Sequence, residues 1–218
     1  MFLGASRETL VGMEFATPDV PDAVRRLAFP GYVNVFSMGL GNRNLWGTES
    51  LFGDWSGHTL LLAQDFYPAL WVANRARNGH PAPYSHNPEA RTNRRLQRFL
   101  VELGVLDADA GNLDCGFLYA SACFLLKDDP DVSAPLRDLT RVLGASRPAV
   151  TFTIDHMPNL RRVIALGRVA GLALGGAELS RHLGARGIAI CYAPHPSRGA
   201  NAAHLSALDA AFKQGSAT

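Results

Sequence analysis

The segment HTLLLAQDFYP, residues 58–68, carries the main evidence for both the fold and the site. Its first half is a short continuous apolar run, which is typical of a strand buried on both faces of a parallel sheet. The run ends on Gln64 and Asp65, and Tyr67 follows closely behind them. Because ligands bind beyond the carboxyl ends of parallel strands, Asp65 is a candidate for chemistry.

Three further segments of the chain share this pattern. Together with the first they predict four strands, at 58–64, 116–122, 161–167 and 187–193. Apolar residues at helical spacing predict helices over 89–103, 133–143, 148–158, 168–183 and about 201–213. This alternation predicts an α/β protein of three layers, α/β/α, around a central, mainly parallel four-stranded sheet. We expect a single domain over residues 1–218, with mostly loop in the first 50 residues.

Composition and charge narrow the classes of partner. Hydrophobic residues make up 47% and charged residues 18%, which is typical of a globular protein. The net charge is only +2, so a polyanion would have to meet a local basic patch. Arginines crowd the segments 91–98 and 161–168, and each segment is either a solvated helix face or a phosphate contact. Without a signal-peptide pattern or a bilayer-spanning segment, we expect a cytoplasmic protein.

The sequence offers little for metals, cofactors or disulfides. Cys115, Cys123 and Cys191 have no CxxC spacing, so neither a disulfide framework nor a four-cysteine metal site is expected. A P-loop and the HExxH and GxSxG motifs are absent. We interpret His80 and His86 as exposed loop histidines rather than metal ligands. No cofactor and no metal are therefore expected.

Two strand ends carry side chains suited to catalysis. Asp65 ends the first strand, and His195 follows the fourth in the segment APHPSRG, residues 193–199. A carboxylate can orient a water, and a histidine can stabilise negative charge on a leaving group. Alternatively, Asp65 caps a following helix and His195 lies in a hydrogen-bonded turn. The residue types alone leave both interpretations open.

The same two segments resemble motifs of the uracil-DNA glycosylases. AQDFYP, residues 63–68, is similar to that superfamily's GQDPYH motif, and His195-Pro196-Ser197 is similar to its HPS motif. Their order and spacing agree over about residues 58–200. The resemblance implies a monomeric DNA repair enzyme with a uracil-DNA glycosylase fold. It would flip uracil, or a related deaminated base, out of DNA and hydrolyse its N-glycosidic bond.

The resemblance also implies roles for the residues of the two motifs. Asp65 would orient the attacking water and stabilise the cationic sugar, and His195 would stabilise the charge that develops on uracil O2. Gln64 and Phe66 would contact the base. Tyr67 would stand against the C5 position and exclude the methyl group of thymine.

Other positions follow from the resemblance more loosely. Ser121 stands near the place of the superfamily's base-reading asparagine. Tyr84 would stack on the base, with Trp71 as the alternative. Ser197 would hold a phosphate, and Arg198 would grip the DNA strand near the lesion.

The first motif departs from that of the superfamily at Ala63, Phe66 and Pro68, and Ser121 cannot reproduce a bidentate amide. Two other functions therefore remain open. One is a non-catalytic nucleic-acid-binding protein on the same scaffold. The other is a small-molecule hydrolase that uses Asp65 and His195 at the mouth of the sheet.

Overall fold

The computed structural model describes residues 19–41, 45–46, 51–65, 67–109, 111, 113–128, 138–197 and 201–214. Within these ranges the chain alternates strands and helices, as predicted for an α/β protein. Two residues assigned to the site from the sequence, Phe66 and Arg198, lie outside the described residues.

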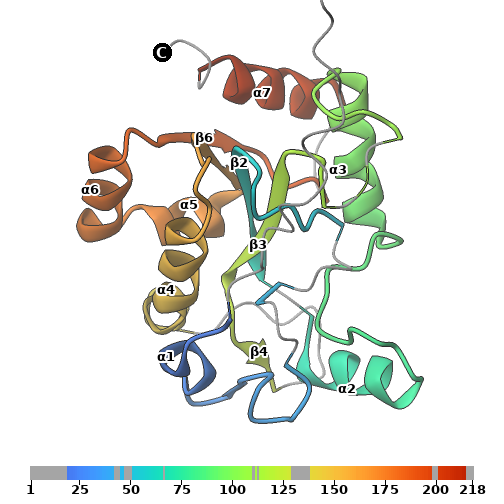
Figure 1. Cartoon of the computed structure of the whole chain (residues 1–218), viewed down its shortest axis with the longest axis vertical. Helices are drawn as coiled ribbons and strands as arrows, with labels where there is room; N and C mark the ends of the chain where they lie inside the picture. Colours follow the sequence, from blue (N-terminus) through green and yellow to red (C-terminus); the bar gives the residue numbers. More distant parts are fainter. Residues whose placement is uncertain are drawn as a thin grey trace, which may run out of the picture.

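Four parallel strands form the central sheet, in the order β3-β2-β5-β6 (Figure 1). They are β2 (Thr59–Asp65), β3 (Phe117–Cys123), β5 (Arg162–Leu166) and β6 (Ala189–Ala193). Each of them begins and ends close to a predicted strand, so the predicted four-stranded parallel sheet is confirmed. The inner strands β2 and β5 are buried along almost their whole length, which explains their continuous apolar sequences.

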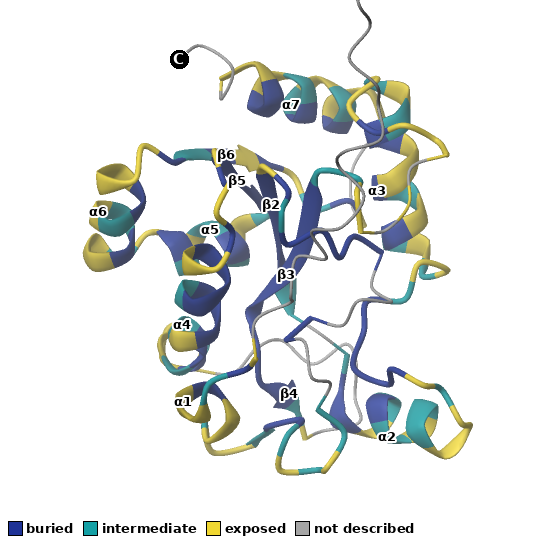
Figure 2. Ribbon diagram, viewed as in Figure 1, coloured by how far each residue is buried: buried dark blue, intermediate teal, exposed yellow. Residues whose placement is uncertain are grey.

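Helices cover both faces of this sheet. Alternate side chains of a strand point to opposite faces. One face packs against α4 (Leu139–Asp155), α5 (Arg168–Leu174) and α6 (Ala177–Ala185). The other packs against α3 (Arg91–Glu102) and α7 (Asn201–Gln214). Figure 2 shows the strands buried between exposed outer helix faces, an arrangement compatible with the three layers predicted.

One helix prediction is wrong because of a proline. The segments 133–143 and 148–158 were expected to form two helices. In their described part they form the single helix α4, and Pro148 lies inside it. Val142 and Val150 on either side of the proline are buried against the sheet. Tertiary packing of this kind holds a helix together where local propensity would interrupt it.

The other differences concern a glycine pair and an additional helix. The helix expected over 168–183 is two helices, α5 and α6, with Gly175 and Gly176 between them. Glycine in a helix interior is destabilising, so the pair is a natural place for the chain to turn. The additional helix is α2 (Ala69–Arg77), which begins directly after Pro68 and follows the end of β2.

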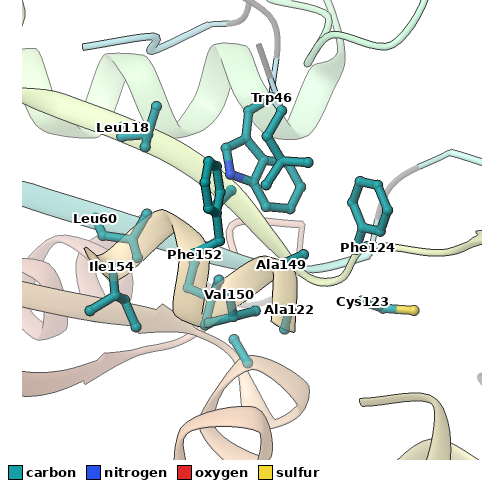
Figure 3. Packing of buried hydrophobic residues seen from close by; sticks show 14 of the residues in the cluster. Trp46, Leu60, Leu118, Ala122, Cys123, Phe124, Ala149, Val150, Phe152 and Ile154 are labelled. Atoms are coloured by element: carbon teal, nitrogen blue, oxygen red, sulfur yellow. The ribbon is translucent and has the colours of Figure 1, made fainter. Parts of the chain in front are cut away.

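The N-terminal region contributes to the core more than its loop-like sequence indicated. The short helix α1 (Asp22–Arg25) packs beside α4 through Val24. Trp46 is fully buried, and its indole N–H donates a 2.8 Å hydrogen bond to Thr153 Oγ1. Figure 3 shows this indole among the apolar side chains between β3 and α4. Trp46 is therefore part of the core. Replacing a buried tryptophan with alanine typically costs about 3–5 kcal/mol.

A second, two-stranded sheet lies at the carboxyl end of β3. The strand β4 (Leu126–Lys127) follows β3 after a short bend and pairs antiparallel with β1 (Tyr32–Val33). Neither strand was expected from the sequence. Their pairing fixes the backbone of Lys127 beside the end of β2, which matters for the site.

Candidate functional site

Asp65 lies at the carboxyl end of β2 and is held by a basic residue. Its Oδ2 is 2.9 Å from Nζ of Lys127, and the two side chains are only 20% and 13% exposed. The alternative role of Asp65 as a helix cap is wrong. The N-cap position of α2 is Pro68, and no side chain caps that helix by a hydrogen bond. Lys127 was not predicted as a site residue.

Tyr67 is fixed by a stack of side chains that begins just beyond β2. Its ring lies 3.7 Å, centroid to centroid, from the ring of Trp71, at 21°. The guanidinium of Arg75 lies 4.8 Å from the centroid of the Trp71 ring. Burial raises the pKa of Tyr67, although the nearby Arg75 opposes this shift. Tyr67 is therefore a neutral phenol of fixed orientation, and Trp71 already stacks on two neighbours.

Ser121 lies beside Ala63 in the register of β3 and β2 and is fully buried. Its hydroxyl is 3.3 Å from Nε2 of His86. His86 is 4% exposed, which corrects the expectation of an exposed loop histidine. Burial, assisted by the positive charge of Arg75, lowers the pKa of His86 to about 3. At neutral pH it is therefore an uncharged partner of Ser121.

Tyr84 does not lie where a base could stack on it in this structure. It is 0% exposed, and its hydroxyl donates a 3.3 Å hydrogen bond to the carbonyl of Phe124. The rings of Trp46 and Phe124 pack against it, with centroids 6.5 Å and 5.9 Å away. The expectation that Tyr84 stacks on the base is therefore wrong for this conformation, since core side chains cover its ring.

The turn after β6 presents His195 in one tautomer. Its Nδ1 is 2.7 Å from the hydroxyl and 3.3 Å from the backbone nitrogen of Ser197. A backbone N–H can only donate, so Nδ1 accepts and the proton of the neutral ring lies on Nε2. The hydrogen-bonded turn expected as an alternative is thus real. In this tautomer the N–H of the His195 ring is on Nε2.

Side chains from the helices α3 and α7 form hydrogen bonds with this turn. Arg95 of α3 donates to the carbonyl of Pro196 at 2.8 Å and to Oδ1 of Asn201 at 2.8 and 3.1 Å. Nε2 of the buried His204 in α7 lies 2.8 Å from the carbonyl of His195. The sequence left Arg95 as either a solvated or a phosphate-facing residue, and its contacts instead give it a role in fixing the turn.

Gly167, at the end of β5, lies against His195. Its φ is +91°, a conformation that favours glycine. A Cβ at this position would be 2.9 Å from Cβ of His195, closer than side chains pack. Glycine at the end of β5 therefore lets this strand pack closely against His195, where any side chain would clash.

Asp65 and His195 share one edge of the sheet but do not follow adjacent strands. In the order β3-β2-β5-β6, β5 separates the strands that carry them. At a spacing of about 4.8 Å per strand, the two strand ends are roughly 10 Å apart. That gap suits a carboxylate and an N–H donor that act on different parts of one nucleoside-sized ligand.

Three of the hollows on the described surface lie at the two edges of the sheet, and two of these three are near this edge. One of about 430 Å³ runs along Gly167, Arg168, Tyr192 and Pro194. Another of about 510 Å³ lies between α2 and the β1–β4 sheet. The third, of about 560 Å³, opens at the opposite, amino-terminal edge of the sheet, around His58 and neighbouring polar residues. Asp65 and His195, the side chains suited to catalysis, lie at the carboxyl-terminal edge and not beside this third hollow.

Metal and thiol chemistry receive no support from the described residues. Among them no group of three or more His, Cys, Asp and Glu side chains could hold a metal ion. None of the three cysteines forms a disulfide, and burial raises the pKa of Cys115 to about 11 and of Cys123 to about 12. Both thiols are therefore protonated at neutral pH and poor nucleophiles.

Comparison with known proteins adds no relative: no family model matches the chain, and no curated protein is significantly similar to it. In the described part of the chain, no helix is both long and apolar enough to cross a membrane.

Proposed function

We propose that this protein is a DNA glycosylase that hydrolyses the N-glycosidic bond of uracil, or of a related deaminated base, in DNA. The observation that supports the proposal is that the Asp65 carboxylate and His195, whose ring N–H is on Nε2, lie at the same edge of the sheet. A flipped nucleotide would lie between them, with the sugar towards Asp65 and the base towards His195.

Each group then has a chemical task. As the glycosidic bond breaks, the sugar gains positive charge, which the Asp65 carboxylate stabilises while it orients the attacking water. The base leaves with negative charge on O2, which the Nε2–H of His195 stabilises by a hydrogen bond. The fixed ring of Tyr67 borders the base near C5. Ser197, which is exposed in the turn, would contact a phosphate.

The decisive experiment is a cleavage assay on a labelled oligonucleotide with one deoxyuridine, single- or double-stranded, with EDTA present. Alkali-sensitive scission at uracil but not at thymine is the expected result. Asp65→Asn should lower the rate by about 10²–10⁴-fold, the usual contribution of a positioned acid–base group. Undiminished activity of Asp65→Asn would remove Asp65 from the mechanism.

A non-catalytic nucleic-acid-binding protein is the second candidate. The ion pair with Lys127 favours it, because a carboxylate held by an ammonium is less available to orient a water. DNA binding that weakens with salt, without any scission of the uracil oligonucleotide, would support this candidate. If the protein neither cleaves nor binds DNA, the remaining candidate is the small-molecule hydrolase.

A further inference from the structure

Lysine is rare in this chain, and its placement is informative. Of the 21 Lys and Arg residues only two are lysines, Lys127 and Lys213. Lys213 is 76% exposed on α7 and pairs with Asp209. Lys127 is 13% exposed and pairs with Asp65, the candidate catalytic carboxylate. The one largely buried lysine therefore lies at the proposed site.

Elsewhere the chain uses arginine where a cation must bridge several groups. Arg75, Arg95 and Arg186 each make two or more hydrogen bonds to the backbone or to side chains. A planar guanidinium suits such bridging, but it stays protonated and is not a nucleophile in proteins. A lysine can lose its proton and form a Schiff base with a carbonyl carbon. A simple counterion to Asp65 would not require a lysine.

The backbone holds Lys127 in place. It pairs with Tyr32 in the β1–β4 ladder, and the N–H of Asp128 donates to the carbonyl of Gly31 at 3.3 Å. The ε-amine ends 2.9 Å from the Asp65 carboxylate. If that carboxylate directs a water at C1′ of the sugar, the amine is within reach of the same carbon.

We propose that Lys127 is a nucleophile that gives this protein a second activity, cleavage of the DNA strand at abasic sites. The inference rests on the proposed function, since removal of the base produces the abasic deoxyribose. In its open form this sugar carries an aldehyde at C1′. Asp65 takes a proton from the Lys127 ammonium, and the free amine adds to the aldehyde.

The reaction balances without an oxidant or reductant. The carbinolamine loses water and becomes a protonated imine between Lys127 and C1′. The imine makes the C2′ hydrogen acidic, and a base removes it. Its electron pair forms the C2′–C3′ double bond as the C3′–O bond breaks and the phosphate leaves. Water then hydrolyses the imine, which frees Lys127 and an unsaturated aldehyde on the 3′ end.

The test uses the full chain and an oligonucleotide with a preformed abasic site, so it does not depend on uracil excision. With cyanoborohydride present, we expect a covalent protein–DNA adduct, which peptide mapping places on Lys127. Without the reductant, we expect strand scission before any alkali treatment. Lys127→Arg, which keeps the charge beside Asp65, should reduce both signals to the level without protein. Lys213→Arg is the matched control and should keep both.

An adduct on Lys213 or on the N-terminal amine, or no adduct at all, would overturn the proposal. Mapping on the unaltered protein decides the question even if Lys127→Arg fails to fold. The two functions fail separately in this design. Uracil excision without trapping removes only the lyase activity, and trapping without excision removes only the glycosylase.

Discussion

The two histidines near the site, His195 and His86, have different surroundings. His195 lies in a partly exposed turn, where the backbone N–H of Ser197 donates to Nδ1 and so places the proton of the neutral ring on Nε2. His86 is buried, and its burial, assisted by the charge of Arg75, lowers its pKa and keeps it neutral at pH 7. Desolvation therefore sets the charge state of His86.

The burial of His86 predicts an acid-sensitive fold. Its pKa is about 3 in the folded protein, against 6.5 for an ordinary histidine. The unfolded chain therefore binds the proton first. The stabilising effect is complete at pH 7 and is lost as the pH falls from 6.5 towards 3. At 1.36 kcal/mol per unit, unfolding free energy should fall by about 2 kcal/mol between pH 6.5 and pH 5 from this residue.

Denaturant unfolding at pH 7, 6 and 5 measures this effect. His86→Gln removes the titrating group while it keeps a polar neighbour for Ser121. The variant should be less stable at pH 7 but lose less stability on acidification. A pH slope equal to that of the unaltered protein would show that His86 takes its proton without unfolding.

At the scale of elements, α3 and α7 are expected to position the turn that carries His195. Arg95→Gln removes charged hydrogen bonds to Pro196 and Asn201, worth about 2 kcal/mol together if the turn loosens. Expressed fully in the transition state, this loss is roughly 30-fold in kcat for uracil excision. Arg94→Gln, one residue away on the exposed face, is the matched control for kcat alone, because Arg94 pairs with Glu89 while Arg95 holds the turn.

Separate kcat and KM values distinguish positioning from DNA binding. Loss through a displaced His195 lowers kcat, whereas loss of a phosphate contact raises KM and makes binding less sensitive to salt. Arg95→Lys should recover part of kcat, because the ammonium can still reach one of the two acceptors. A change confined to KM would show that Arg95 contacts DNA and does not position the turn.

The elements differ in how well the sequence could predict them. Strands β2 and β5 are buried on both faces, so each is a continuous apolar run that stands out in the sequence. The β1–β4 pair has two residues per strand and joins segments almost a hundred positions apart. No local pattern encodes such a pair. The contact of Lys127 with Asp65 was therefore not predictable, although Asp65 itself was found.

His86 and Arg95 show the same limit for side chains. Each lies in a polar stretch that is typical of an exposed surface. Each instead forms a hydrogen bond with a residue far away in the sequence. Those partners, Ser121 and Pro196, lie 35 and 101 positions away. The sequence thus indicated the strand ends of the site but could not indicate what holds them in place.

At the scale of the whole molecule, the net charge of +2 makes the position of each exposed arginine important. Arg168 begins α5 just after the end of β5, at the edge of the candidate site. Arg94 lies near the start of α3. Its neighbour Arg95 contacts the turn that carries His195. Arg161 precedes β5 and lines the hollow at the opposite edge. DNA held at the site would meet the first two and not the third.

Charge reversal at these positions tests which edge binds DNA. Arg94→Glu and Arg168→Glu should each weaken binding to duplex DNA and lower the slope of log K against log salt by about 0.9 per lost phosphate contact. Arg161→Glu changes the net charge equally and should leave the slope unchanged, so it separates local contact from overall charge. Fluorescence anisotropy over a series of salt concentrations measures all three. If Arg161→Glu alone lowers the slope, DNA binds at the amino-terminal edge, and the site built on Asp65 and His195 cannot be where the base is removed.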